Sequence, residues 1–196
     1  MVERLREEQG VSVFPSQAEA ERFRLLAITP FERPDPALAR VWLRYGAAVA
    51  VDLGRDPALS KGLFDELSRE RRAGLGLRLA DGVTPPALAL PETVQFVVVA
   101  GSPARLPQAW RRVPVLAQVR SCAEAEQALA DGAAGLIAKG QESGGLVGEE
   151  SSFVLLQRLV ELAQARGVRL WSQGGIALNT AAAAVAGGAF GVVIDA

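Results

Sequence analysis

The chain has 196 residues with a formal net charge of −1, and 49% of its residues are hydrophobic. This length suits one well-packed domain and is short for two. The balanced charge argues against a nucleic-acid or acidic-membrane surface, and no apolar run approaches the ~20 residues of a membrane span. The absence of histidine excludes His-based catalytic sets and His-ligated metals, and the single cysteine, Cys122, excludes an internal disulfide. We therefore expect a soluble protein of a reducing compartment, which favours the cytoplasm.

Eight short apolar runs follow one another along the chain, and their length and bounds are typical of buried strands. The expected strands are residues 25–28, 48–53, 75–80, 96–100, 115–119, 135–138, 168–172 and 190–194. Helical segments separate most of them. Asp-Pro pairs at 35–36 and 56–57 place an N-cap before a proline at the first helical position, and residues 121–124 form a capping box. A capped helix is also expected after residues 102–103, whereas the proline-rich connection 84–91 should lack a long helix.

Strands that alternate with helices predict a parallel (β/α)₈ barrel, because these strands are apolar throughout, as strands covered on both faces must be. An open doubly wound sheet is the alternative, although such sheets usually stop at five or six strands. No helix follows the eighth strand, so we expect a TIM barrel that lacks its final helix. Residues 1–22 would form an N-terminal leader or flap, and residues 23–196 a C-terminally truncated barrel. The bare outer face predicts that the isolated protein forms a homodimer or covers this face with residues 1–22.

A strand that runs into a glycine-rich loop dominates the second half of the chain. The apolar run 135–138 leads into Lys139-Gly-Gln-Glu-Ser-Gly-Gly-Leu146-Val-Gly148, and residues 149–152 are typical of a helix cap and first turn. Glycines let the backbone turn sharply and approach a ligand, and α/β proteins bind small molecules at the carboxyl ends of their strands. An ordinary strand-to-helix turn explains the same spacing equally well.

The pattern Lys139-Gly-Gln-Glu-Ser-Gly-Gly-Leu-Val-Gly is followed by Gln173-Gly-Gly-Ile176 and Gly188-Ala-Phe-Gly191. It resembles the flavin barrels of the nitronate monooxygenase (2-nitropropane dioxygenase-like) family, and the flavin-dependent enoyl-acyl-carrier-protein reductases share it. The resemblance covers the second half of the chain well and the first half only in its order of elements. The opening Phe23-Arg-Leu-Leu-Ala-Ile-Thr-Pro also resembles N-terminal barrel modules of large fatty-acid or polyketide synthases.

The resemblance implies an FMN cofactor across the carboxyl-end mouth of the barrel, with its phosphate on backbone N–H groups. Gly174 and Gly175 would hold the phosphate, Lys139 and Ser143 would face the flavin, and Thr29 would pack near the ring. The full set of implied cofactor-binding residues is Thr29, Pro30, Lys139, Ser143, Gly144, Gly145, Gly174 and Gly175. Arg78 stands near the position where an asparagine usually meets the flavin.

Two positions depart from the pattern of the family. Leu146 occupies the place of the catalytic histidine, and Asp195-Ala196 replaces a Gly-Thr pair that binds phosphate. Leucine cannot transfer a proton, and a carboxylate at Asp195 would repel a phosphate by about 1 kcal/mol even in water at 4 Å. Reduction of an enoyl thioester remains compatible with these changes, because the cofactor supplies the hydride.

Two functions from different classes follow. The first is an FMN-dependent oxidoreductase with impaired chemistry, acting on a small molecule or an acyl thioester. The second is a catalytically inactive structural or docking domain of a larger polyketide or fatty-acid synthase. A phosphate-binding aldolase or synthase barrel is less favoured, because Lys139 is the one candidate Schiff-base lysine and its surroundings are not obviously apolar. No metal site, nucleic-acid partner or membrane partner is expected.

Overall fold

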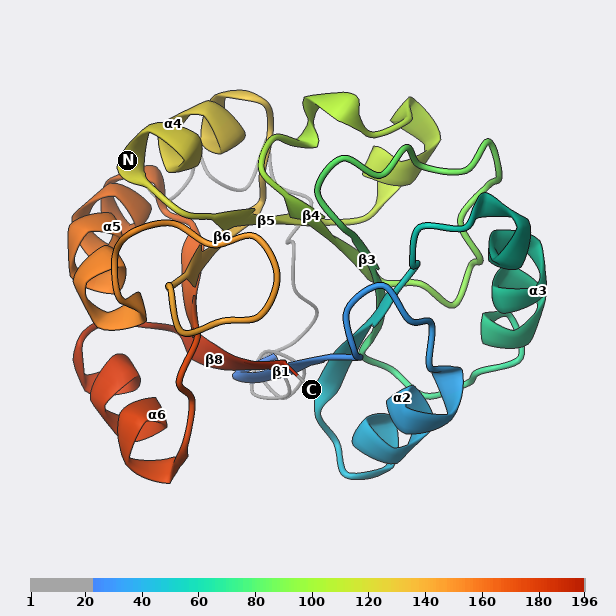
Figure 1. The fold of residues 1–196 in the computed structure, drawn as a ribbon, viewed down its shortest axis with the longest axis horizontal. Coiled ribbons are helices and arrows are strands. Elements are labelled where there is room, and N and C mark those ends of the chain that lie inside the picture. The colour runs from blue at the N-terminus through green and yellow to red at the C-terminus, as the bar shows by residue number, and fades with distance from the viewer. Residues whose placement is uncertain (1–22, 196) are drawn as a thin grey trace, which may run out of the picture.

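The computed structural model describes residues 23–195, in which eight parallel strands close into a barrel (Figure 1). Each strand pairs with the next one along the chain, and the last pairs with the first. The strands are β1 Leu25–Ile28, β2 Ala48–Asp52, β3 Leu75–Leu79, β4 Phe96–Ala100, β5 Val115–Val119, β6 Gly135–Lys139, β7 Arg169–Gln173 and β8 Gly191–Asp195. The closed eight-stranded sheet confirms the expected parallel barrel and excludes the open doubly wound sheet.

Two apolar layers hold the barrel together. Alternate strand residues point inward and outward, so one layer fills the interior and the other packs between the strands and the surrounding helices. The amino-terminal end of the interior is filled by aromatic rings, among them Phe23 and Phe96, whose centroids lie 5.3 Å apart in edge contact. Gly76 makes room for this packing, because a Cβ atom there would overlap the ring of Phe96. Because these aromatic rings fill the amino-terminal end of the barrel, a binding site is expected at the carboxyl-terminal end, which we call the mouth.

Five α-helices are found in the described part of the chain, and they lie outside the barrel (Figure 1). They are α2 Pro36–Arg44, α3 Pro57–Leu67, α4 Cys122–Ala130, α5 Ser152–Arg166 and α6 Leu178–Ala186. The predicted N-caps are confirmed: Asp35 accepts from the N–H of Leu38 at 2.8 Å, and Asp56 accepts from the N–H of Ala58 at 2.9 Å. Glu149 and Glu150, which we assigned to the first turn of a helix, precede α5 instead.

The connection between β4 and β5 differs from the prediction. Instead of one capped helix it contains two short 3₁₀ segments, Pro103–Arg105 and Gln108–Arg112. Pro107 lies between them and offers no backbone N–H, which explains why a continuous α-helix does not form. Trp110 anchors the second segment, since its side chain is fully buried and its indole N–H donates to the carbonyl oxygen of Leu88 at 2.9 Å. The proline-rich connection between β3 and β4 lacks a helix, as expected.

No helix within residues 23–195 covers the outer side of β8 and β1, which lie between α6 and α2 (Figure 1). Leu25 and Ile194 are partly exposed on these two strands. The predicted leader, residues 1–22, lies outside the described residues, as does Ala196. Among the helices that the structure describes, none combines the length and the apolarity needed to cross a membrane.

Candidate functional site at the barrel mouth

A continuous chain of polar side chains crosses the mouth from β2 to β8. The Asp52 carboxylate forms an ion pair with the Arg78 guanidinium through Oδ2 and Nη1. Arg78 Nε donates to Gln118 Oε1 at 3.0 Å, and Gln118 Nε2 donates to Gln173 Oε1 at 2.6 Å. Gln173 Nε2 in turn donates to Asp195 Oδ2 at 3.1 Å. We call these five residues the mouth network. Because each donor meets an acceptor, the network compensates for burying its polar groups and fills the mouth.

Asp52 also orders the loops next to the mouth network. Its Oδ1 atom accepts from the backbone N–H groups of Gly54 at 2.8 Å and Glu32 at 3.1 Å. The hydroxyl oxygen of Thr29 accepts from the backbone N–H of Asp52 at 2.9 Å, and Thr29 is fully buried. Thr29 therefore links β1 to β2 in this structure, whereas the sequence comparison placed it beside a flavin ring.

Lys139 lies at the end of β6 with only 3% of its surface exposed. Its ammonium donates to the carbonyl oxygen of Leu146 at 2.9 Å and lies 5.2 Å from the centre of the Phe31 ring. Burial lowers the pKa of Lys139 from its ordinary value of 10.5 to about 8, and the positive charges of Arg78 and Arg120 contribute in the same direction. Asp195 and Asp81 oppose the shift without cancelling it. Among the described residues, Lys139 is therefore a lysine whose pKa, at about 8, lies well below the ordinary value.

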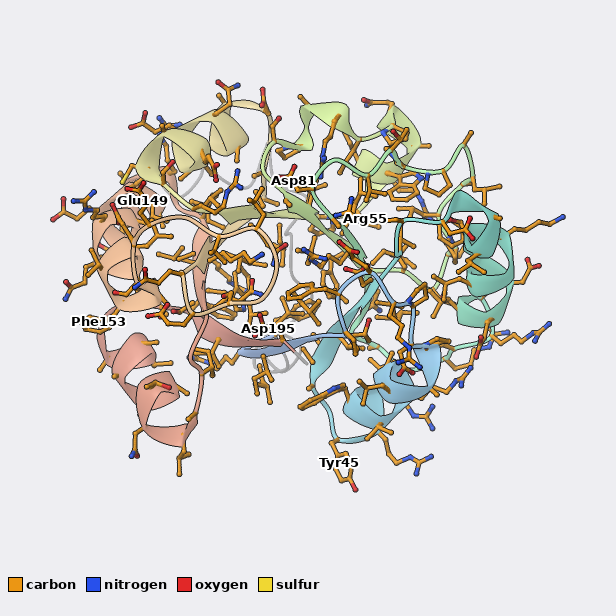
Figure 2. All side chains as sticks on the ribbon, in the orientation of Figure 1. Tyr45, Arg55, Asp81, Glu149, Phe153 and Asp195 are labelled. Atoms are coloured by element: carbon orange, nitrogen blue, oxygen red, sulfur yellow. The ribbon has the colours of Figure 1, made fainter. Side chains whose placement is uncertain are left out.

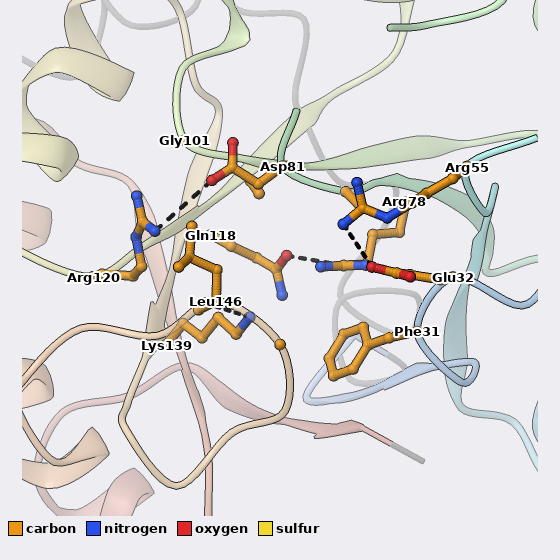
Figure 3. A pocket seen from close by; sticks show the side chains of 13 residues that line it. Phe31, Glu32, Arg55, Arg78, Asp81, Gly101, Gln118, Arg120, Lys139 and Leu146 are labelled. Atoms are coloured by element: carbon orange, nitrogen blue, oxygen red, sulfur yellow. Dashed lines mark hydrogen bonds and ion pairs between the residues drawn. The ribbon is translucent and has the colours of Figure 1, made fainter. Parts of the chain in front are cut away.

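A small pocket lies between Lys139 and the mouth network (Figure 3). Its volume is about 60 Å³, and Phe31 and the loop residues Gly145 and Leu146 form part of its wall. The charged residues of the wall are Arg55, Arg78, Arg120, Lys139, Glu32 and Asp81. Each of the three arginines is already paired with a carboxylate, in the ion pairs Arg55–Glu32, Arg78–Asp52 and Arg120–Glu124. Among the described residues, Lys139 is the cation of this wall for which no ion pair is found. A larger groove of about 500 Å³ lies between the β2–α3 and β3–β4 loops, away from Lys139.

Of the two predicted phosphate-binding glycines, Gly174 is covered by the loop that follows β6, whereas Gly175 is exposed. Gly174 is buried, and a Cβ atom there would lie 2.9 Å from Ser143 Oγ and 3.3 Å from the carboxylate of Glu142. Glu142 Oε2 accepts from the N–H of Ser152 at 2.9 Å, at the start of α5. Ser152 Oγ donates to the carbonyl oxygen of Gly174 at 3.1 Å. The carboxylate of Glu142 thus lies against Gly174, at the place where the resemblance implies a phosphate.

The structure separates the predicted site residues into two groups. Lys139 and Gly145 line the small pocket, with Thr29 and Pro30 at the end of β1 nearby in the mouth. The group beneath and within the β6–α5 loop consists of Ser143, Gly144, Gly174 and Gly175. The N–H of Gly144 donates to Asp195 Oδ2 at 3.3 Å, which connects this group to the mouth network.

Sequence reasoning missed several residues that form the mouth. In the sequence, Asp52 and Gln118 belong to apolar strands and Gln173 to a glycine motif, and no pattern there points to Phe31 or Arg120 as residues of a site. A signal was present, because a polar residue at the carboxyl end of a barrel strand points to a site. Asp52 and Gln173 each end a strand, and Gln118 is the fourth of the five residues of β5.

The described residues at the mouth do not fit a flavin mononucleotide. Pockets that hold cofactors usually measure roughly 300–1,000 Å³, whereas this one measures about 60 Å³. The carboxylate of Glu142 lies beside Gly174, which would receive the phosphate, and like charges at close range repel. Asp195 also lies at the mouth (Figure 2), where it accepts hydrogen bonds from Gly144 and Gln173. The expected flavin site is therefore filled by the protein's own side chains.

Comparisons with known proteins agree on the fold. FabK from Thermotoga maritima matches with a TM-score of 0.69 and 23% identity, over 89% of this chain and 58% of that chain. Nitroalkane oxidase from Streptomyces ansochromogenes matches with a TM-score of 0.69 and 19% identity, over 91% of this chain and 67% of that chain. A native KDPGal structure matches with a TM-score of 0.56 and 19% identity, over 88% of this chain and 82% of that chain. No protein-family model and no curated protein sequence matches. The chain spans less than two thirds of FabK, and identities this low establish the fold alone.

Proposed function

We propose that the chain is a barrel of the flavin-oxidoreductase type that has lost flavin chemistry and serves as a structural or docking domain of a larger synthase. The observation that supports this proposal is the filled mouth. The mouth network satisfies its own polar groups, and the remaining space of about 60 Å³ is far too small for a flavin.

The position of Leu146 supports the same proposal. The resemblance implies a catalytic histidine here, but the side chain of Leu146 is 57% exposed and cannot transfer a proton. Its backbone carbonyl instead accepts the hydrogen bond from Lys139, which fixes the loop against the mouth. The loop thus closes the barrel where the related enzymes would use it for chemistry.

An FMN-dependent oxidoreductase is the second candidate. It is favoured by the likeness in shape to FabK and to a nitroalkane oxidase, and by a buried lysine at the mouth that could stabilise negative charge on a reduced cofactor. Its substrate would be a small molecule or an acyl thioester. This candidate requires the β6–α5 loop to move and the mouth network to open.

Titration with FMN separates the two functions. We expect no saturable binding by the wild-type protein and no FMN-dependent oxidation of NADH or NADPH. If the second candidate holds and the wild type binds FMN, Asp195→Gly should raise the affinity by about fivefold at low salt, because it removes about 1 kcal/mol of repulsion from the phosphate, and the gain should shrink as salt is added. Leu146→His is the matched control, since it restores the family residue without changing the charge near the phosphate. Tight FMN binding by the wild type would contradict the proposal and support the second candidate.

A structural or docking role also predicts association through the outer side of β8 and β1. We expect the isolated protein to form a dimer in light scattering, because Leu25 and Ile194 leave apolar surface partly exposed there. Ile194→Lys should raise the dimer dissociation constant by about tenfold or more, because desolvating the lysine ammonium at an interface has a free-energy cost. Leu59→Lys on α3, a 54% exposed position on another face, should have no effect. A monomer at every concentration would contradict this prediction.

A further inference from the structure

In the proposed structural function, the buried amine at the barrel mouth only holds the β6–α5 loop through its hydrogen bond to Leu146. We propose that Lys139 captures a small 2-oxo acid in the mouth pocket by forming a Schiff base with its carbonyl carbon. This inference goes beyond the proposed function, because it concerns a covalent binding site and needs neither a flavin nor a partner domain.

The surroundings of Lys139 favour a nucleophilic amine. Within residues 23–195, no carboxylate oxygen lies within ion-pair distance of its Nζ atom, and Arg78 and Arg120 are the cations that act on it. With a pKa of about 8, roughly one molecule in ten carries the neutral amine at pH 7, against fewer than one in a thousand for an ordinary lysine. The carbonyl of Leu146 accepts a hydrogen from either form of the amine, so the contact at 2.9 Å holds Nζ in place without consuming its lone pair.

The pocket selects the size and charge of the ligand. A volume of about 60 Å³ corresponds to roughly four water molecules, which suits glyoxylate or pyruvate and excludes larger sugars. On the pocket wall, Arg55 and Arg120 are ion-paired but keep 59% and 27% of their side-chain surfaces exposed (Figure 3). A carboxylate next to the reacting carbonyl could therefore accept hydrogen bonds from a partly exposed guanidinium group of this wall.

The reaction balances without a further reactant. The ammonium of Lys139 first releases a proton to solvent, and the lone pair of the neutral amine then attacks the carbonyl carbon to give a carbinolamine. Loss of one water molecule forms the carbon–nitrogen double bond of the imine. Cyanoborohydride can trap this imine by delivering a hydride to the carbon, while water supplies the proton for the nitrogen.

The chain contains two lysines, and this makes the test direct. The full chain is incubated with glyoxylate and cyanoborohydride near neutral pH, and carboxymethyl-lysine is located by peptide mass spectrometry. We expect labelling of Lys139 to exceed that of Lys61, which lies exposed on α3, by roughly tenfold or more. In denaturant the two lysines should react equally, which provides the internal control. Equal labelling in the folded protein, or labelling of Lys61 alone, would overturn the proposal.

A second variant tests recognition of the carboxylate. Arg120→Gln should reduce labelling by glyoxylate more than labelling by acetaldehyde, which has the carbonyl group but no charge. The quantity to compare is the labelling of Lys139 by glyoxylate divided by its labelling by acetaldehyde. Loss of Arg120 also changes the pKa of Lys139, but this change affects both reagents alike and cancels in the ratio. An unchanged ratio would contradict recognition of an anionic ligand. Flavin binding is read by a different signal in the FMN titration, so failure of one proposal leaves the other testable.

Discussion

Replacing Asp52 with alanine should lower the free energy of unfolding by about 3–5 kcal/mol, because it leaves the guanidinium of Arg78 buried without its ion-pair partner. Both side chains are almost completely buried, with 4% and 0% of their surfaces exposed for Arg78 and Asp52. The substitution also removes the acceptor for the N–H groups of Glu32 and Gly54. Urea unfolding followed by circular dichroism measures the change, with the midpoint shifted to lower urea.

Two controls show whether burial is the cause. The double variant Asp52→Ala with Arg78→Met should recover much of the lost stability, because an apolar side chain replaces the unpaired charge. Glu66→Ala removes an ion pair with Arg40 in which the side chains of Glu66 and Arg40 are 39% and 44% exposed. This substitution should change the free energy of unfolding by less than about 1 kcal/mol. If Asp52→Ala behaved like Glu66→Ala, the mouth network would not contribute to the fold in the way its geometry indicates.

Lys139→Met should stabilise the protein at pH 7 by about 2–3 kcal/mol, because the free-energy cost of burying the ammonium exceeds the stabilisation from its hydrogen bond to Leu146. The lowered pKa of Lys139 shows that the fold disfavours the charged form of this side chain. Below about pH 8 the lysine is protonated in both the folded and the unfolded chain, so the full cost is present. Between about 8 and 10.5 the unfolded chain binds more protons than the folded one, and the stability of the wild type rises with pH.

The stability difference between Lys139→Met and the wild type should therefore shrink as the pH rises from about 8 to 10.5. Denaturant unfolding at a series of pH values measures it. Lys61→Met provides the matched control, because this lysine is exposed and its loss should leave stability unchanged at every pH. If the stability difference between Lys139→Met and the wild type did not depend on pH, the Lys139 ammonium would not be a buried charge in the folded protein. A stabilising result would indicate that the lysine is retained for a function, as residues of active sites often are.

The fold could be predicted well because its signals are local. Eight apolar runs predicted the eight strands, with every boundary within one residue of the observed one. The Asp-Pro pairs gave α2 and α3, since a side chain that caps a helix acts on N–H groups only two or three residues away. The helix expected between β4 and β5 is absent for a reason that is also local. Pro107 interrupts the segment, and the burial of Trp110 holds the chain in short turns.

The site could be predicted only in part. Lys139 was identified from its place in the glycine-rich loop, but its burial could not be read from neighbouring residues, since Phe31 and Arg78 come from distant parts of the chain. The resemblance placed phosphate at Gly174 and Gly175. Only the structure shows that Glu142 and Ser143 cover Gly174, because a loop can fold back over a neighbouring strand end in many ways.

The sequence by itself determined the barrel, because strand and helix patterns and their caps depend on residues close together in the chain. It also determined the absence of histidine and the loss of a proton-transferring group at Leu146. The tertiary structure alone decided what the mouth contains. Gln118 and Gln173 are 55 positions apart and meet because closure of the barrel brings the ends of β5 and β7 together. Such contacts depend on the curvature and register of all eight strands, and for this reason no stretch of sequence encodes them locally.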